Sequence, residues 1–256
     1  MYNAAVNPEP IQVCPDCRGT GWMPVSRDGI EGVSRCGCIR RSRSERLLDI
    51  ARIPPRYAAC ELSNFELRPP HTNQSLQLAK IAADRFVEHY PMSTPFGLLF
   101  MGPKGVGKTH LAVGIIKQLM RVKSVPCLFR TFPELLKEIQ NSYNPVSQSS
   151  ELSLLGPILE SEVLVLDELG AQNPSSWVKD TVGYILNYRY NENKVTILTT
   201  NYLDRDDPKD RQKGVSYTLA ERIGDQMRSR LHEMCKMVIM TGDDFREMIK
   251  NREHHF

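Results

Sequence analysis

Five short apolar runs recur beyond residue 96, and each is separated from the next by a longer segment with helical periodicity. The runs are GLLFMG (97–102), VPCLFR (125–130), EVLVLD (162–167), VTILTT (195–200) and KMVIMT (236–241). Strands that are apolar along their whole length are buried on both faces, which is typical of parallel sheets covered by helices. The pattern therefore predicts an α/β fold with a parallel sheet built from these runs.

The chain before this region differs in composition. Residues 1–46 are rich in Gly, Pro, Cys and Arg and show no period long enough to build a core. Residues 47–70 predict a short helix that is broken at Pro54 and Pro55, followed by an extended connection. A helix over 72–90, with Leu76, Ile81 and Phe86 as candidate core residues, leads into the sheet. These changes divide the chain into the segments 1–46, 47–70 and 71–256.

The bulk composition is that of an ordinary soluble protein, with 41% hydrophobic and 25% charged residues, and the net charge of +3 is too small to indicate nucleic-acid binding by itself. Seven arginines between residues 35 and 56 accompany only two acids, so this stretch suits phosphates, an acidic partner or a solvated linker, and these interpretations stay open. No apolar run reaches the ~18 residues of a membrane span, and MYNAAVNPEP lacks the regions of a signal peptide. We therefore expect a cytoplasmic protein with no membrane partner.

The segment GPKGVGKT (102–109) follows one predicted strand and opens an amphipathic helix, which is the context of a phosphate-binding loop. Its glycines permit the backbone to turn N–H groups onto phosphate oxygens. Lys108 is expected to bridge the β- and γ-phosphates of ATP, and Thr109 to hold Mg²⁺. The predicted phosphate site comprises Gly102, Pro103, Lys104, Gly105, Val106, Gly107, Lys108, Thr109 and His110.

A second polar cluster is expected where two further strands end. In VLVLDELG (163–170), Asp167 is placed to hold the magnesium shell and Glu168 to polarise an attacking water. Asn201, at the end of ILTTN, is suited to position that water, although an asparagine that only forms a turn is an alternative. Because ligands bind at the carboxyl ends of parallel strands, these side chains and the phosphate loop predict one ATPase site.

The order of these motifs resembles the AAA+ ATPases, and IPPRYAACELSNF, LNYRYN, SRLHEMC and GDDFR extend the match to the replicative helicase loaders of the DnaC/DnaI type. The related IstB-like transposition helpers share much of the same domain, and the resemblance covers roughly residues 50–250. It implies a five-stranded sheet in the order 5-1-4-3-2, ATP-dependent self-association and a role in DNA replication.

The resemblance also implies two arginine roles. Arg230 in SRL matches the arginine finger that reaches the ATP of a neighbouring subunit, and Arg246 in DDFR matches the sensor-2 arginine that acts on the phosphates of its own subunit. Arg222 and Arg228 lie in the same stretch, so the finger assignment stays open among the three, and a salt bridge is a credible alternative role for Arg228.

Two sets of aromatic residues are candidates for ligand contacts. Tyr57 and Phe65 are suited to stack on adenine, and plain core packing is the alternative for both. Single-stranded DNA is expected to contact Ser175, Trp177 and Lys179 at a helix start, together with Tyr143 in the polar stretch 141–150. For Trp177 the alternative is a half-buried packing residue.

Four cysteines form the pattern C-x2-C-x18-C-x-C at residues 14, 17, 36 and 38. Because disulfides are rare in the cytoplasm and four thiolates suit tetrahedral Zn²⁺, Cys14, Cys17, Cys36 and Cys38 predict a zinc site that folds a module over residues 1–46. An iron–sulfur cluster and a redox pair are alternatives. The three remaining cysteines are expected to be buried small apolar side chains.

Loaders of the DnaI type resemble this layout of a metal-bearing module, a linker and an ATPase, which implies that the module docks the hexameric replicative helicase. Zinc knuckles also bind nucleic acid. The sequence thus predicts a zinc module (1–46), a linker and adenine-side segment (47–70) and an AAA+ ATPase domain (71–256). We expect an ATP-dependent helicase loader that binds single-stranded DNA. A DNA-dependent ATPase assisting a transposase and an adaptor that uses its ATP site chiefly for binding are alternatives.

Overall fold

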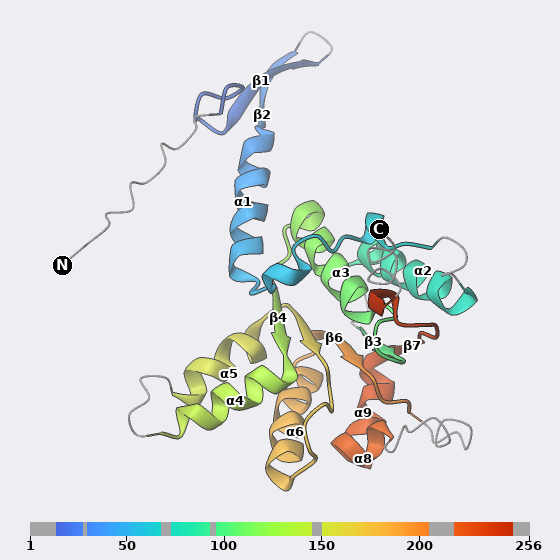
Figure 1. Ribbon diagram of the computed structural model, residues 1–256. Coiled ribbons are helices and arrows are strands. Elements are labelled where there is room, and N and C mark those ends of the chain that lie inside the picture. Colours follow the sequence, from blue (N-terminus) through green and yellow to red (C-terminus); the bar gives the residue numbers. More distant parts are fainter. Residues whose placement is uncertain are drawn as a thin grey trace, which may run out of the picture.

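The computed structural model describes residues 14–27, 30–67, 73–92, 96–144, 150–204 and 218–247. Its centre is a parallel sheet of β3 (Gly97–Met101), β4 (Cys127–Thr131), β5 (Val163–Asp167), β6 (Val195–Thr200) and β7 (Cys235–Ile239). The strand order is β4-β5-β6-β3-β7. Numbered within the sheet and read from β7, this is 5-1-4-3-2, so the predicted fold and strand order are confirmed (Figure 1).

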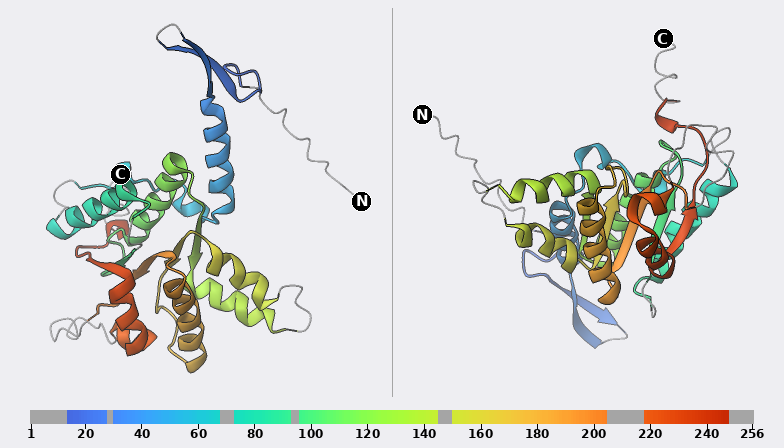
Figure 2. Two further views of the ribbon diagram at one scale, coloured as in Figure 1. Left: turned by 180° about the vertical axis from the view of Figure 1, so that it is seen from behind. Right: turned by 90° about the horizontal axis from the view of Figure 1, so that it is seen from below.

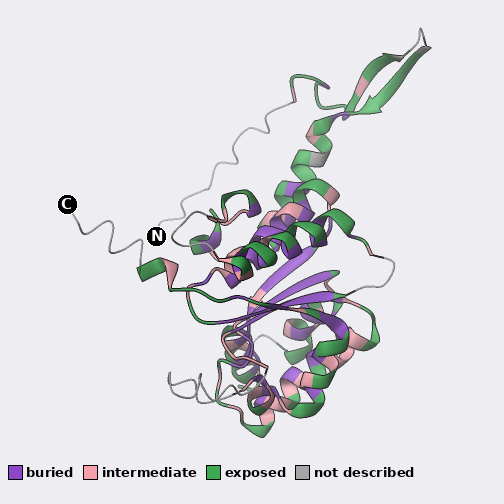
Figure 3. Ribbon diagram, turned by 90° about the vertical axis from the view of Figure 1, so that its right-hand side faces the viewer, coloured by how far each residue is buried: buried purple, intermediate pink, exposed green. Residues whose placement is uncertain are grey.

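Helices cover both faces of the sheet because alternate side chains of each strand enter two separate cores (Figure 2). Leu98 and Phe100 face one core with α2 (Gln74–His89) and α3 (Lys108–Lys123). Leu99 and Met101 face the other. That second core is closed by α4 (Phe132–Ser142), α5 (Glu151–Glu160), α6 (Ser176–Asn191), α8 (Leu219–Ile223) and α9 (Asp225–Met234). The inner strands β3, β5 and β6 are therefore buried throughout, as their unbroken apolar runs predict (Figure 3), whereas the edge strand β7 exposes Lys236 and Ile239.

One predicted core residue of α2 is wrong. Leu76 and Phe86 are buried, but Ile81 is 46% exposed. The buried positions follow the helical period from Leu76 through Ala79 and Ala83 to Phe86, and Ile81 lies on the opposite side of that helix.

The N-terminal part differs more from expectation. A hairpin of β1 (Trp22–Arg27) and β2 (Ile30–Arg35) stands away from the sheet and leads into α1 (Gly37–Ile50), which begins about ten residues before the predicted helix (Figures 1 and 3). Among the residues of α1 and its C-cap whose burial is described, Ser44, Leu47 and Ala51 are buried, and the Ala51 carbonyl accepts from the Phe129 N–H at 2.8 Å. So few buried positions leave no apolar period to read. The helix crosses the predicted boundary at residue 46, and the division into three segments stays a prediction.

Two short 3₁₀ turns, Pro55–Tyr57 and Leu62–Asn64, connect α1 to the body. Among the described residues, no helix is long and apolar enough to cross a membrane.

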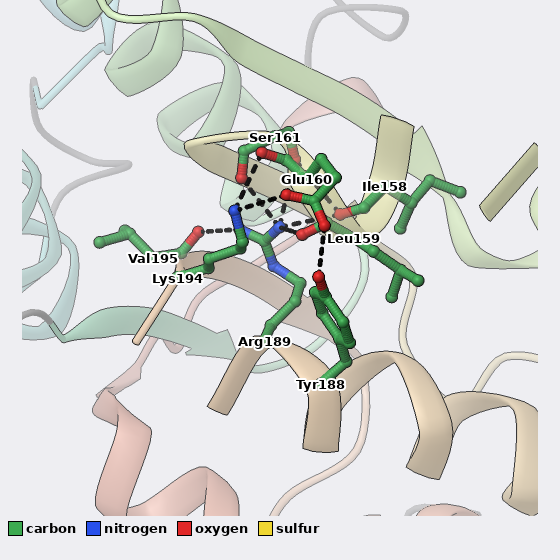
Figure 4. A network of polar contacts seen from close by, with 8 residues as sticks. All are labelled: Ile158, Leu159, Glu160, Ser161, Tyr188, Arg189, Lys194 and Val195. Atoms are coloured by element: carbon green, nitrogen blue, oxygen red, sulfur yellow. Dashed lines mark hydrogen bonds and ion pairs between the residues drawn. The ribbon is translucent and has the colours of Figure 1, made fainter. Parts of the chain in front are cut away.

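A fully buried arginine joins two elements of the second core (Figure 4). Arg189 of α6 donates from Nη1 to the carbonyls of Ile158 (2.8 Å), Leu159 (3.2 Å) and Ser161 (2.9 Å) at the end of α5. Nη2 and Nε donate to the Val195 carbonyl and the Thr196 hydroxyl at the start of β6. The last carbonyls of a helix have no partner within it, so this guanidinium satisfies the end of α5 from outside.

Candidate functional site

The phosphate loop turns between β3 and α3 with three glycines at positive φ. At Gly102 (φ 150°) a Cβ would lie 1.9 Å from the Met240 carbonyl oxygen, and at Gly107 (φ 96°) it would lie 2.6 Å from the Phe65 ring. Only glycine fits either place. The loop therefore has the close packing and backbone angles that the motif requires.

Lys108 points back into this loop rather than into solvent. Its buried ammonium donates to the carbonyls of Gly102 at 2.8 Å and Pro103 at 2.6 Å. Burial lowers the pKa of Lys108 to about 8, and the nearby Asp167 opposes that shift. A poorly solvated cation at the start of a helix is suited to phosphate oxygens.

Asp167 ends β5 beside Thr109 and Thr199, and both hydroxyls donate to its Oδ1, at 2.8 and 2.6 Å. Its Oδ2 is buried without a hydrogen-bond partner. Burial raises the pKa of Asp167, against the effect of the two hydroxyls. An orphaned carboxylate oxygen next to a threonine hydroxyl is a donor set that fits Mg²⁺.

Glu168 has a left-handed backbone, with φ at 62°, and its N–H donates to the Thr199 hydroxyl at 3.0 Å. Such a conformation is uncommon outside glycine and here turns the chain directly after the strand. Glu168 and Asn201 both line the cavity next to the phosphate loop.

That cavity has a volume of about 550 Å³, in the usual range for a small-molecule site. Several predicted site residues line it: Tyr57, Lys104, Gly105, Gly107, Lys108, Thr109, His110, Glu168, Asn201 and Arg246. The sequence interpretation missed Arg56, Cys60, Thr199 and Phe245. Arg56 lies directly beside a predicted residue, and its guanidinium stands 4.6 Å from the Tyr57 ring centroid.

The two predicted adenine-side aromatics differ in position. Tyr57 lines the cavity and is also buried against Phe129, with ring centroids 6.0 Å apart. Its ring is therefore a core residue as well as part of the cavity wall. Phe65 does not line the cavity. Its ring covers Gly107 and meets the His110 ring edge-on at 5.4 Å.

The wall that carries Tyr57 and Cys60 is fastened to α3 by polar contacts. Lys117 donates to the carbonyls of Ala58 at 2.6 Å and Cys60 at 3.0 Å and pairs with Glu61. His110 Nε2 lies 2.8 Å from the Glu61 carbonyl. The phosphate loop and this wall are thereby held by one helix.

Residues 34–253 match the family of IstB-like ATP-binding proteins, which is most of the chain. The chain belongs to this family. The chain is also 30% identical to a solved DnaC helicase loader, with a TM-score of 0.61 over 73% of this chain and 99% of that one.

Two curated relatives extend the comparison. The phage-like element PBSX protein XkdC of Bacillus subtilis (strain 168) is 24% identical over 90% of this chain and 82% of its own length. The replicative helicase loader DnaC of Escherichia coli (strain K12) is 26% identical over 84% of this chain and 80% of its own. This IstB-like protein is thus a DnaC-type AAA+ protein by sequence and by fold.

The candidate arginines of this IstB-like protein occupy different surroundings. Arg246 lines the cavity of its own chain, where the neighbouring Phe245 N–H donates to the Gly105 carbonyl at 3.3 Å. Arg222 donates to the Gln172 carbonyl at 3.1 Å and stacks over Tyr202. Arg228 forms the salt bridge offered as its alternative role, with Nη2 2.7 Å from Asp204 Oδ2.

Arg230 lies on α9 outside this cavity, with its guanidinium 5.9 Å from the Tyr190 ring centroid. It has no ion pair with a described acid. Of the three arginines in this stretch, Arg222 donates a hydrogen bond and Arg228 forms a salt bridge, whereas Arg230 lies over an aromatic ring.

The residues predicted for DNA contact lie on two helices. Ser175 caps α6 by accepting from the Val178 N–H at 3.3 Å, and Lys179 follows in the first turn. Trp177 is half-buried against the second core, as its packing alternative describes. Tyr143 is 53% exposed at the end of α4, and residues 145–149 of its polar stretch lie outside the described residues.

The four clustered cysteines are free thiols whose sulfurs all lie within 4.8 Å of one another. The Sγ atoms of Cys14 and Cys36 are 3.8 Å apart, and those of Cys17 and Cys38 are 3.4 Å apart. A tetrahedron with Zn–S bonds of about 2.3 Å has edges of about 3.8 Å. The sulfur set therefore fits Zn²⁺, and the positive φ values at Arg18 and Gly19 provide the turn after the first pair.

Proposed function

We propose that this IstB-like protein is an ATP-dependent loader that delivers a hexameric replicative helicase onto DNA. The observation that carries the proposal is the intact phosphate-loop site in a chain that aligns with 99% of the solved chain of a DnaC helicase loader. The related DnaC proteins named as replicative helicase loaders support the same role.

In this proposal the site binds and hydrolyses ATP. Lys108 holds the β- and γ-phosphates, and the free oxygen of Asp167 and the hydroxyl of Thr109 hold Mg²⁺. When bound there, Mg²⁺ would supply positive charge beside the phosphates. Glu168 orients and polarises the attacking water from the cavity wall, Asn201 positions it, and Arg246 contacts the phosphates.

In this proposal hydrolysis depends on assembly, because Arg230 does not line the cavity of its own chain. In a ring or filament of subunits this guanidinium reaches the ATP of the neighbour, as an arginine finger. The proposed partners are a single DNA strand at Ser175, Trp177, Lys179 and Tyr143, and the helicase at the zinc module.

A mixing experiment tests the finger. Arg230→Ala and Lys108→Ala proteins each lack one half of the composite site, so each is inactive alone, and mixtures regain part of the ATPase rate. Arg228→Ala, which removes a cation already paired with Asp204, is the matched control and keeps the rate. An active Arg230→Ala protein, or mixtures that never regain activity, refute the finger.

The loading role is tested with helicase and a closed single-stranded circle. We expect the helicase to enter the circle only with this protein and ATP, and Glu168→Gln to stop turnover. The family match also favours a helper ATPase of a transposase as a second candidate. Strand-stimulated ATPase activity without capture of the helicase would favour that candidate and exclude the loader.

A further inference from the structure

A basic cavity lies where the hairpin, the cysteine cluster and α1 meet. Arg35 and Arg43 line it, together with Gly37 at the first turn of α1 and Ser124 at the end of α3 in the body, and its volume is about 330 Å³. Neither arginine forms an ion pair with a described acid, whereas Arg121, Arg130 and Arg228 in the body all do. We call this feature the arginine cavity.

The arrangement of α1 extends the positive charge along one side. Ile39, Arg43 and Arg46 are spaced by four and three residues and share a helix face. The acid Glu45 stands two residues from Arg43 and points elsewhere, whereas Asp49 stands three residues after Arg46 and shares its side of the helix, so the uncompensated charge is that of Arg43. The first turn of α1 holds no acidic residue, and the Ile39 N–H in that turn donates to the Cys36 carbonyl at 3.2 Å.

An aromatic ring stands next to this charge. Trp22 is paired across the hairpin with Arg35, and the Arg35 guanidinium lies 5.8 Å from the indole centroid. Trp22 is 49% exposed, and the other hairpin residues whose burial is described are not part of either core. An exposed aromatic face beside unpaired arginines is the combination by which proteins hold a single nucleic-acid strand.

We propose that this surface binds single-stranded DNA, with phosphates in the arginine cavity against Arg35 and Arg43 and a base stacked on Trp22. The surface lies outside the ATPase-domain residues proposed above for DNA contact, so the chain has two strand-binding surfaces. Binding here involves neither ATP nor assembly, and it stands whether or not the proposed loader function does.

The test uses the full-length, zinc-loaded protein without nucleotide, in a Trp177→Ala background that removes the aromatic contact of the other surface. Binding of fluorescein-labelled oligo(dT) is followed by anisotropy from low to high salt. Each lost phosphate contact lowers the salt slope by about 0.7, so Arg35→Gln combined with Arg43→Gln should lower it by about 1.4. Arg41→Gln removes an exposed arginine of the same helix outside the cavity and serves as the matched control.

Trp22 distinguishes a strand from other polyanions. Trp22→Ala should weaken oligo(dT) binding about fivefold or more, and Trp22→Phe should restore most of it. One zinc per chain and unchanged ATP binding show that each variant is folded.

Three outcomes overturn the proposal. In the first, the double arginine variant changes the slope no more than Arg41→Gln. In the second, Trp22→Ala binds as tightly as the parent, which leaves a polyanion site without base stacking. In the third, the double arginine variant keeps its affinity for the strand but no longer captures the helicase, which makes the surface a protein-docking site.

Discussion

Replacing Arg189 with methionine removes the cation that closes the C-terminal end of α5 and keeps much of the side-chain volume. Each of the last four carbonyls of α5 accepts a hydrogen bond. Pro157 accepts from the Ser161 N–H, Ile158 and Leu159 accept from Arg189, and Glu160 accepts from Lys194. The substitution leaves the middle two without their main donor, and β6 loses its tie to α5 (Figure 4).

The magnitude follows from the contacts. Hydrogen bonds from a charged donor each contribute about 1.5–3 kcal/mol, and Arg189 makes them to five residues. Burial opposes this by several kcal/mol, because it strips water from the guanidinium and lowers the pKa of Arg189 to about 10. We expect a net loss of about 3–5 kcal/mol in the free energy of unfolding, or about 10 °C in Tm for a domain of this size.

Urea denaturation followed by circular dichroism measures this loss as a shift in midpoint at constant slope. Arg189→Lys keeps the charge with fewer, differently placed donors and should lose about half as much. Arg121→Met is the matched control, because that arginine is 44% exposed in its ion pair with Glu61 and should contribute about 0–1 kcal/mol. An Arg189→Met protein that loses less than about 1 kcal/mol would refute this account of the buried cation.

Three further predictions concern the two ligand sites. Burial lowers the pKa of Lys108 from 10.5 to about 8, so above about pH 8 the folded, nucleotide-free protein loses a proton that the unfolded chain keeps. The free energy of unfolding should therefore rise towards pH 10, while the affinity for ATP falls. An ATP affinity that stays constant from pH 7 to 9.5 would contradict this prediction. Cys36→Ser should lower the zinc content measured by mass spectrometry, whereas Cys60→Ser, outside the cluster, should keep one zinc per chain. Gly107→Ala should abolish ATP binding in a titration, because its Cβ would meet a ring at 2.6 Å, whereas Gly156→Ala meets nothing within 4 Å inside α5 and should raise stability by about 0.5–1 kcal/mol in urea denaturation.

The sheet was predictable because its inner strands β3, β5 and β6 are buried on both faces and keep unbroken apolar runs. The phosphate loop and Asp167 were predictable for a related reason, since polar residues that directly follow a buried strand of a parallel sheet lie at the edge where ligands bind. Arg189 carries no comparable signal. A charged residue enters the core only because the end of α5, some thirty residues earlier, needs donors there, and nothing local in LNYRYN indicates that need.

The same limit explains the missed residues of the site. Cys60 and Phe245 reach the cavity from opposite ends of the ATPase region, carried there by the contacts of Lys117 and Gly105. Their positions depend on tertiary packing rather than on spacing within a motif. The early start of α1 has another cause, because a helix that touches the body at only a few positions shows no amphipathic period.

The structure also indicates how a strand at α6 would affect the ATP site. The turn after Glu168 is fixed to β6 at two points: the Leu169 N–H donates to the Thr199 carbonyl at 2.8 Å, and the Thr200 hydroxyl donates to the Leu169 carbonyl at 2.8 Å. Arg222 holds the next residues through the Gln172 carbonyl. The turn ends at Ala171, whose N–H donates to the Glu168 carbonyl, and residues 172–174 separate it from Ser175, the cap of α6. The proposed strand contact and the proposed catalytic acid therefore share one short segment that is held by these hydrogen bonds. If both proposals hold, coupling between DNA and hydrolysis needs no long pathway through the domain, because the start of α6 and the acid lie on the same short segment.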